Sequence, residues 1–364
     1  MASPESPSSA PAGSIGAVNL SEMTTLRLGG PADEVVEATT EAELVEAVRD
    51  ADERGVPVLL VAGGSNLVVS DAGFRGRVVR IATRGITADA EPGDTSCGGA
   101  VVRVAAGEEW DAFVAHAVAS GWSGVEALSG IPGSVGATPV QNVGAYGQEV
   151  AQTIAQVRAW DRVEGRVRTF AASDCDFSYR HSRFKAEPDR FVILEVTFQL
   201  PTASLGAPVA YAELARVLGV EVGQRAPAAD VRAAVLALRA AKGMVLDAAD
   251  HDTWSAGSFF TNPVLSAEAA ARLPDEAPRF PQPDGTVKTS AAWLIERAGF
   301  AKGHSPAGVE GRASLSTKHT LALTNRGSAN AEDLLALARA VRDGVEEAFG
   351  VRLVNEPVLV GLTL

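Results

Sequence analysis

Residues 129–147 read Ser-Gly-Ile-Pro-Gly-Ser-Val-Gly-Ala-Thr-Pro-Val-Gln-Asn-Val-Gly-Ala-Tyr-Gly, with five glycines and two prolines in one short stretch. Glycine loses much backbone entropy when it is ordered, and proline removes a backbone donor, so the stretch favours neither a helix nor a packed strand. It is predicted to be a loop. Small residues let main-chain amides approach a ligand closely, and clustered amides suit phosphate. A glycine-rich surface turn is the competing interpretation.

Another glycine loop is predicted upstream, so that in chain order 63–67 is the first glycine loop and the loop that begins at 129 is the second. Residues 41–53 have helical apolar spacing after Thr40, a plausible N-cap, and the apolar run 58–62 is typical of a buried strand. That run leads directly into Gly63-Gly64-Ser65-Asn66-Leu67. The chain contains neither G-x-G-x-x-G nor a Gly-Lys pair, which disfavours Rossmann and P-loop sites. Two glycine loops without these fingerprints indicate a nucleotide held by backbone amides in another architecture.

The remaining pattern mixes strands and helices. Apolar or alternating runs predict strands at 78–81, 101–105, 153–160, 166–170, 191–200, 352–354 and 358–362. Helical periodicity predicts helices at 109–120, 228–241, 290–298 and 331–349. The mixed, acidic segment 243–254 is the best candidate for a linker into a further domain.

Composition restricts the class of protein. Lys plus Arg number 32 against 45 Asp plus Glu, a net charge of −13, so a nucleic-acid or anionic-membrane surface is not expected. Cys97 and Cys175 form no disulfide framework, the five histidines have no metal-ligand spacing, and no apolar run is long enough to cross a bilayer. The Ser, Pro, Ala and Gly of residues 1–16 predict a disordered tail and no signal peptide. We therefore expect a cytoplasmic protein without a metal.

Several motifs occur together in one order. Besides the two glycine loops, these are Thr25-Leu-Arg-Leu-Gly-Gly30, Phe177-Ser-Tyr-Arg-His-Ser-Arg-Phe-Lys185, Gly257-Ser-Phe-Phe-Thr-Asn-Pro263, Ser290-Ala-Ala-Trp-Leu-Ile-Glu-Arg-Ala-Gly299 and Asn355-Glu-Pro357. In this order they resemble the UDP-N-acetylenolpyruvoylglucosamine reductase family, in its longer branch with a substrate-capping tyrosine loop. The resemblance covers roughly residues 19–362.

The resemblance implies an α+β fold with a two-lobed FAD-binding domain of the vanillyl-alcohol-oxidase/PCMH type and a C-terminal α+β substrate domain. The predicted boundaries are a tail at 1–18, lobe 1 at 19–84 plus 351–364, lobe 2 at 85–242 and the substrate domain at 243–350. The glycine loops then become the cradle of the FAD pyrophosphate. Its predicted residues are Gly63, Gly64, Ser65, Asn66, Leu67, Ser129, Gly130, Ile131, Pro132, Gly133, Gly136 and Ala137.

The family implies an enzyme of peptidoglycan precursor synthesis. NADPH reduces a tight, non-covalent FAD, and flavin N5 passes hydride to UDP-N-acetylglucosamine enolpyruvate, giving UDP-N-acetylmuramate. By resemblance Ser258 is the proton donor, and Arg180 and Glu356 stabilise the enediolate that develops at the substrate carboxylate. A turn, a surface ion pair and a solvated glutamate are the respective structural alternatives. An unprotonated Glu356 would repel the substrate anion, so we expect it to be protonated or tightly paired.

A second set of residues is assigned to substrate binding: Tyr179, Tyr211, Lys242, Asn262 and Lys288. The lysines suit diphosphate or the nicotinamide nucleotide. Two residues depart from the family pattern: His181 stands where aspartate is common, and Ala212 stands where glycine is usual. These departures put the fine positioning of Arg180 and Tyr211 in doubt. A monomer is favoured, with the oligomeric state left open. An alcohol oxidase or dehydrogenase on the same flavin fold, and a nucleotide-sugar sensor without turnover, are the alternative functions.

Overall fold

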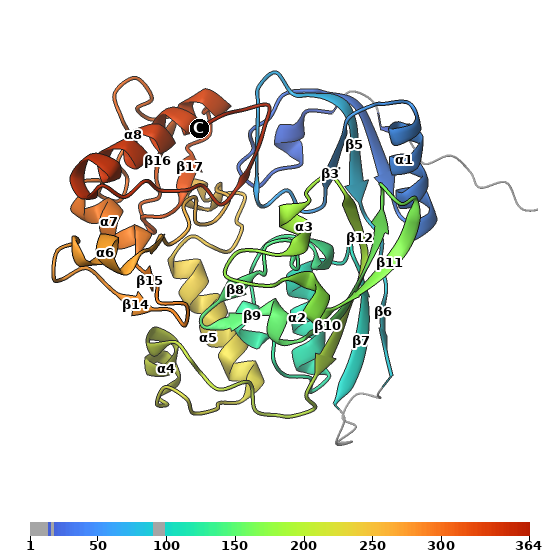
Figure 1. Cartoon of the computed structure of the whole chain (residues 1–364), viewed down its shortest axis with the longest axis horizontal. Helices are drawn as coiled ribbons and strands as arrows, with labels where there is room; N and C mark the ends of the chain where they lie inside the picture. Colours follow the sequence, from blue (N-terminus) through green and yellow to red (C-terminus); the bar gives the residue numbers. More distant parts are fainter. Residues whose placement is uncertain (1–13, 16–17, 90–98) are drawn as a thin grey trace, which may run out of the picture.

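The computed structural model describes residues 14–15, 18–89 and 99–364, which form three packed parts (Figure 1). We call them lobe 1, lobe 2 and the C-terminal part. Most of the predicted tail, and Cys97, lie outside the described residues. Within the tail range, Ser14–Ile15 form β1, which pairs with β2.

Lobe 1 is a mostly parallel sheet of order β1-β2-β5-β3 with one covering helix. Its bounds are β2 Ala32–Ala38, α1 Glu41–Glu53, β3 Val58–Val61 and β5 Phe74–Ile81. Thr40 and Glu43 form a capping box that fixes the start of α1. The C-terminal strand β18 (Val358–Val360) pairs in parallel with β4 (Leu67–Val69), directly after the first glycine loop.

Lobe 2 is an antiparallel sheet of order β11-β10-β12-β7-β6. Its strands are β6 Ile86–Ala88, β7 Ala100–Ala105, β10 Ile154–Asp161, β11 Arg166–Ala171 and β12 Phe191–Leu200. The other elements are α2 Trp110–Ala119, β8 Gly144–Ala145, β9 Gln148–Glu149, α3 Arg183–Ala186, α4 Ala212–Leu218 and α5 Ala228–Ala241. Fully buried Trp110 and Phe113 of α2 pack on Phe198 of β12, so α2 is fixed on one face of the sheet.

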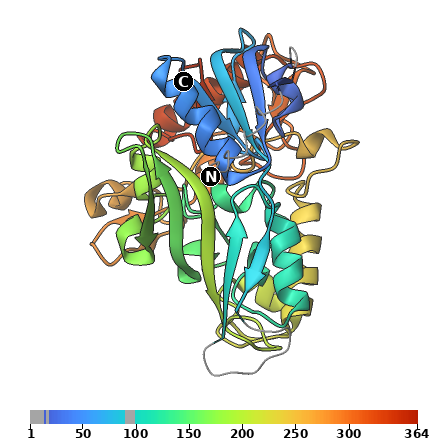
Figure 2. The same cartoon turned by 90° about the vertical axis from the view of Figure 1, so that its right-hand side faces the viewer.

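Lobes 1 and 2 are joined through α1. Leu44 and Val48 share a buried cluster with Val192 and Leu194 of β12. Arg158 and Arg162 add ion pairs to α1, at 2.8 Å to Glu41 and 2.6 Å to Asp52. Figure 2 shows the blue helix α1 beside the upper ends of the green strands of lobe 2.

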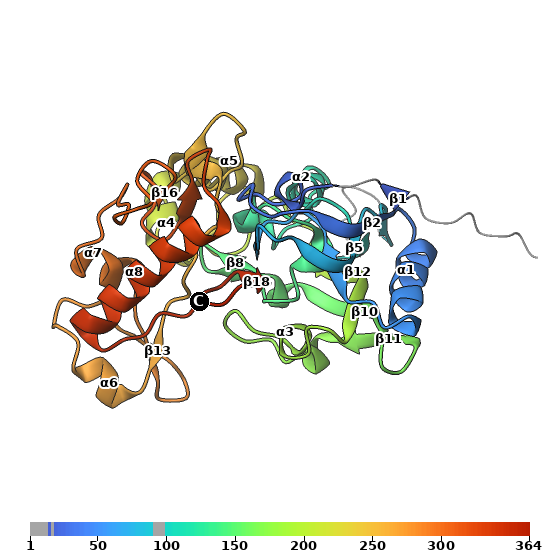
Figure 3. The same cartoon turned by 90° about the horizontal axis from the view of Figure 1, so that it is seen from above.

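The C-terminal part surrounds helix α8 (Ala331–Phe349), which is capped by Asn330 and ended by Gly350. Its other elements are β13 Val264–Leu265, α6 Ala267–Ala271, β14 Phe280–Pro281, β15 Val287–Lys288, α7 Ala291–Arg297, β16 Ala313–Leu315 and β17 Leu323–Asn325. After α8 the chain returns to the centre of the molecule at β18 (Figure 3). Its core also takes in Leu26, Leu28 and Val68 of lobe 1.

The strand predicted at 352–354 is wrong. This segment makes only isolated main-chain bonds to the 259–261 segment, from Thr261 N to Val354 O and from Glu356 N to Phe259 O, around one bridge between Phe260 and Asn355. Pro357 follows and has no N–H to continue a ladder. The result is a short contact that brings Glu356 beside the segment that carries Ser258.

Candidate active site

The two glycine loops touch each other. Ser65 Oγ donates a hydrogen bond of 3.0 Å to Pro132 O. A Cβ on Gly63 would lie 2.6 Å from Gly133 Cα, so only glycine allows this approach. Gly64 Cβ would lie 1.8 Å from Met23 O, which excludes a side chain there too.

Both loops carry backbone amides without partners. Among the described residues, the amides of Gly63, Gly64, Ser65 and Asn66 in the first loop donate to no protein group. In the second loop the same holds for Ile131, Gly133 and Ser134, and the buried Ser134 Oγ also lacks a partner. Gly64 and Ser134 are buried and the other residues are partly or fully accessible, and clustered free amides of this kind suit a bound anion.

The second loop is anchored from behind. Gly130 N donates to Asp111 Oδ1 at 2.6 Å, and Gly136 N donates to Ala106 O at 2.8 Å. Asp111 is itself held by Arg232 of α5 at 2.6 Å. Ser129 is buried, and Ala137 lies in a short 3₁₀ turn that ends the loop. The loop is thus fixed by α2 and α5 while the amides of Ile131, Gly133 and Ser134 stay without protein partners.

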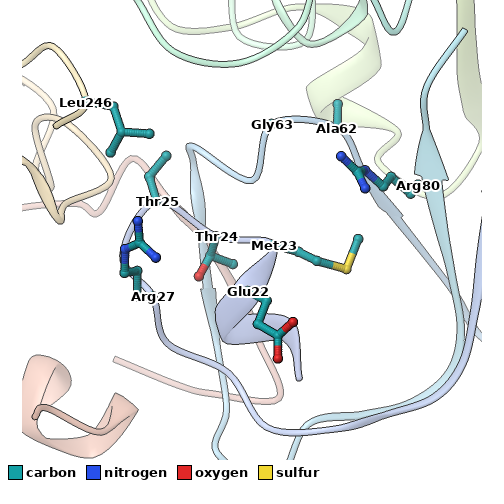
Figure 4. A pocket seen from close by; sticks show the side chains of 9 residues that line it. All are labelled: Glu22, Met23, Thr24, Thr25, Arg27, Ala62, Gly63, Arg80 and Leu246. Carbon is teal, nitrogen blue, oxygen red and sulfur yellow. The ribbon is translucent and has the colours of Figure 1, made fainter. Parts of the chain in front are cut away.

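A cavity of about 260 Å³ opens beside the first loop. Figure 4 shows Arg27 and Arg80 on opposite sides of it, with Met23, Thr24 and Thr25 between them. A smaller cavity of about 30 Å³ is lined by Pro132, Arg239, Ser255 and Gly257. It therefore borders both the second glycine loop and the segment carrying Ser258.

Arg180 lies in a strained turn. Ser178 and His181 exchange main-chain hydrogen bonds of 3.2 and 3.1 Å, and Arg180 has a φ of 53°, a left-handed conformation that is rare for arginine. Lys185 Nζ donates to Arg180 O at 3.0 Å. The His181 side chain is exposed and only its main chain shapes the turn, so the family's aspartate is not needed for this geometry.

The guanidinium of Arg180 reaches Glu356. Arg180 Nε lies 3.1 Å from Glu356 Oε1, an ionic contact whose N–H is not aimed at the carboxylate. The terminal nitrogens donate to Asn142 O at 3.3 Å and Gly144 O at 2.8 Å. The two terminal nitrogens carry four N–H groups, so two of these four remain for a ligand. Arg180 is therefore rigidly held without being saturated.

Glu356 is largely enclosed, with 12% of its side chain exposed. Burial raises its pKa, and Arg180 and Lys185 only partly oppose that rise. Gln141 Nε2 also donates to Glu356 Oε1, at 3.1 Å. The expectation of a tightly paired glutamate is consistent with this arrangement, and the raised pKa favours the neutral form.

Ser258 directly precedes a residue whose main chain is hydrogen-bonded to Glu356. The main chain of the following residue, Phe259, accepts from Glu356 N at 2.8 Å. Phe259 and Phe260 are buried in the C-terminal core and fix the segment, while Ser258 is only partly buried. Within the described chain, no protein group is hydrogen-bonded to Ser258 Oγ. Its hydroxyl is thus available to a ligand.

Three residues of the predicted binding set belong to the same cluster. Asn262 N donates to Tyr179 Oη at 3.4 Å, and Asn262 Oδ1 accepts from Ala291 N at the start of α7. Lys288 Nζ lies 4.6 Å from the centre of the Tyr179 ring. Tyr179, Asn262 and Lys288 therefore lie beside Arg180.

The other two residues of the predicted binding set, Tyr211 and Lys242, form a separate cluster at α4. Tyr211 is 46% exposed and packs edge-on against Tyr146, with ring centres 5.5 Å apart. Lys242 pairs with Glu213 and lies 5.8 Å from the centre of the Tyr146 ring. Ala212 begins α4 without distortion. No direct contact joins Tyr211 or Lys242 to Arg180 within the described residues.

Comparison with known proteins assigns the family. Residues 248–360 match the model of the C-terminal domain of UDP-N-acetylenolpyruvoylglucosamine reductase, and residues 32–171 match an FAD-binding domain. The chain is 58% identical over 347 residues to the UDP-N-acetylenolpyruvoylglucosamine reductase of Cutibacterium acnes, covering 95% of this chain and 90% of that one. The chain belongs to this family.

Other relatives agree. The Streptomyces coelicolor UDP-N-acetylenolpyruvoylglucosamine reductase is 58% identical over 356 residues, covering 95% of this chain and 90% of that one. The crystal structure of the Thermus caldophilus reductase superposes with a TM-score of 0.63 at 25% identity, covering 94% of this chain and 98% of that one. As a member of the UDP-N-acetylenolpyruvoylglucosamine reductase family, the chain is an FAD-dependent oxidoreductase of the predicted α+β class.

Site residues that sequence reasoning missed connect the parts of this reductase. Gln141 links Asn66 to Glu356, and Tyr146 links Tyr211 to Lys242. Both lie in the 129–147 stretch, where their polar or aromatic character among small residues was the available signal. Arg239 lies on α5, and its buried Nε has no partner; burial lowers its pKa to about 10. Nothing in the helical pattern of 228–241 distinguished it.

Two further properties concern the described residues of this family member. They contain no group of three or more His, Cys, Asp or Glu placed to hold a metal. None of their helices is both long enough and apolar enough to span a bilayer.

Proposed function

We propose that the protein uses NADPH to reduce UDP-N-acetylglucosamine enolpyruvate to UDP-N-acetylmuramate. The observation that carries the proposal is the Arg180 to Glu356 contact of 3.1 Å, made by distant segments beside the Ser258 segment and the glycine loops. An arginine, a carboxyl of raised pKa and an unpaired hydroxyl at one place suit the addition of hydride and proton across a vinyl group that carries a carboxylate.

The two glycine loops would hold the FAD. Free amides of 63–66 and of 131, 133 and 134 would bind its pyrophosphate, and the glycines would leave room for it. Bound FAD, once reduced, supplies the hydride that the terminal vinyl carbon receives. Lobe 2 and α2 keep the second loop in place during this step.

Arg180 and Glu356 would act on the substrate carboxylate. Hydride addition leaves an electron pair on the carbon next to that carboxylate, and the charge spreads over its oxygens as an enediolate. The two free N–H groups of Arg180 would bind this charge, and a neutral Glu356 would donate a hydrogen bond to it. The raised pKa of Glu356 supports the neutral form at this position.

Ser258 would complete the reaction. Its Oγ–H bond breaks as the proton moves to the carbon next to the carboxylate, and the serine regains a proton from solvent. A hydroxyl is a weak acid, but the carbanionic centre is far more basic, so an aimed donor suffices where water is excluded. Tyr179, Asn262 and Lys288 would bind the substrate beside Arg180, and Tyr211 and Lys242 would bind it from the α4 side.

The proposal has a direct test in the purified protein. It should be yellow, release FAD on denaturation, and oxidise NADPH continuously, beyond one equivalent per flavin, only when the enolpyruvyl sugar nucleotide is present. Bleaching of the flavin by an alcohol would instead favour an alcohol oxidase or dehydrogenase. Binding of the sugar nucleotide with no NADPH oxidation would favour a sensor. We propose that the protein is cytoplasmic and monomeric. Size-exclusion chromatography with light scattering would test the monomeric state.

A further inference from the structure

A chain of side-chain hydrogen bonds runs from the first glycine loop to Glu356. Asn66 Nδ2 donates to Gln141 Oε1 at 3.1 Å, and Gln141 Nε2 donates to Glu356 Oε1 at 3.1 Å. Asn66 is also fixed through its main chain, because its carbonyl accepts from Val358 N at 2.9 Å. Gln141 is thus held between a residue of the first glycine loop and Glu356.

The direction of this chain follows from one backbone carbonyl. Asn66 Nδ2 lies 3.5 Å from Glu356 O, and a carbonyl oxygen can only accept. Asn66 must therefore present its NH₂ group to this side, so Gln141 presents its carbonyl to Asn66. The NH₂ group of Gln141 then faces Glu356, where it can only donate.

Two partners converge on the same carboxylate oxygen. Gln141 Nε2 and Arg180 Nε each lie 3.1 Å from Glu356 Oε1. No protein donor is bound to Oε2 in the part of the chain that the structure describes. A proton on the carboxyl therefore cannot lie on Oε1 without facing another N–H group, and Oε2 is the oxygen left to carry it.

We propose that Gln141 is a positioning residue for the reduction, which holds Glu356 with Oε1 toward Arg180 so that the O–H group on Oε2 donates a hydrogen bond to the substrate carboxylate. This rests on the role of Glu356 in the proposed function. It also implies a coupling: Asn66 belongs to the first glycine loop, so ordering of that loop would set the orientation of Glu356 through Gln141.

The charged surroundings give the direction of the pH effect. Arg180, Lys185 and Tyr179 are the titratable groups that face Glu356 from the 177–185 segment. A hydrogen bond donated to a carboxylate favours its ionised form, so loss of the Gln141 donor raises the pKa of Glu356. If the neutral form is needed, reoxidation of reduced flavin slows as pH rises through that pKa, and without Gln141 this decline moves to higher pH.

The experiment measures the rate of flavin reoxidation by the enolpyruvyl sugar nucleotide in single-turnover mixing from about pH 6 to 10. The variants are Gln141→Met, which keeps length without a donor, and Gln224→Met, the same change at an exposed, distant glutamine. We expect Gln141→Met to move the alkaline decline upward by about one pH unit and to lower the plateau about 10-fold. We expect Gln224→Met to match the wild type.

A decline at the wild-type pH or below in Gln141→Met overturns the inference, whatever the plateau. If Gln141→Met does not retain flavin, Gln141→Glu keeps the volume and places a second carboxyl beside Glu356. It must then move the decline to still higher pH, and an unmoved decline overturns the inference equally.

A further variant separates this inference from the proposed function. Glu356→Gln should slow reoxidation and abolish the alkaline decline. Normal reoxidation in Glu356→Gln would contradict the role of Glu356 itself. If Glu356→Gln slows flavin reoxidation but Gln141→Met leaves the alkaline decline at the wild-type pH, only the role of Gln141 is contradicted.

Discussion

At the scale of single residues, the site depends on groups held in unusual states. Arg180 has a φ of 53°, a conformation that costs an arginine about 1 kcal/mol. Two main-chain bonds and the Lys185 ammonium, whose pKa burial lowers, hold it there. Strain of this kind persists where the surrounding structure fixes it, which is common at functional sites. The identity of residue 181 matters little to this turn, because its side chain is exposed.

The role of Ser258 gives a prediction at this scale. Ser258→Ala should leave flavin content and reduction by NADPH unchanged and slow reoxidation by the enolpyruvyl substrate at least about 100-fold, because the proton donor is gone. Stopped-flow absorbance of the flavin measures both half-reactions. Ser204→Ala, at an exposed serine, is the matched control. Reoxidation at the normal rate in Ser258→Ala would exclude Ser258 as the donor.

At the scale of elements, the two glycine loops depend on contacts that no side chain tolerates. Their glycine content predicted loops, and the structure has a loop at each of the two predicted positions. The contact between Gly63 and Gly133 could not be predicted from the sequence, because it depends on how the two lobes pack against each other. For the same reason Gln141 was missed, since its two partners lie 75 and 215 positions away along the chain.

Flavin binding by the second loop is testable with a matched pair. Gly133 has a φ of 120°, and a Cβ there would lie 2.9 Å from Ser65 Oγ; Gly165 has a φ of 63° in the β10–β11 turn with open space around it. Gly133→Ala should give colourless protein, which the ratio of visible flavin absorbance to protein absorbance would measure. Gly165→Ala places an alanine at positive φ with no close contact and away from the loops, and it should stay yellow. Equal flavin content in both would refute the cradle.

The β10–β11 hairpin holds a buried carboxylate. The Asp161 side chain is 0% exposed and pairs with Arg190 at 2.9 Å and Arg168 at 3.2 Å. Burial opposes its charge, but hydrogen bonds from Arg190, Glu164 N, Arg168 and Val163 N outweigh burial and lower the pKa to about 2. Because the folded-state pKa is depressed, the ionised carboxylate stabilises the fold fully above about pH 4, and this contribution is lost as pH falls through about 2.

Asp161→Asn should therefore lower the free energy of unfolding by about 1–2 kcal/mol at pH 7, and the difference from wild type should shrink below about pH 4. Urea unfolding at several pH values measures it. Asp275→Asn, at an exposed aspartate, should have little effect at any pH. A loss of stability in Asp161→Asn that does not change with pH would contradict the assignment.

At the scale of the whole molecule, local signals predicted most elements. The capping box at Thr40 and the apolar stripe of 331–349 are local features, and α1 and α8 occupy the predicted residues. The strand at 352–354 failed because its apolar pattern serves burial of Leu353 in the C-terminal core and no ladder. Pairing of β18 with β4, and the approach of Glu356 to Arg180, depend on the return of the chain after α8. Only the family resemblance anticipated them.

The central claim is that one site receives electrons from NADPH and delivers them to an enolpyruvyl sugar nucleotide. Anaerobic mixing of the oxidised protein with NADPH, followed by UDP-N-acetylglucosamine enolpyruvate, tests it most directly. We predict that the flavin absorbance is bleached by NADPH and restored by the substrate in stoichiometric amount, with UDP-N-acetylmuramate as the product. A flavin that NADPH bleaches but the enolpyruvyl substrate leaves reduced would contradict the account.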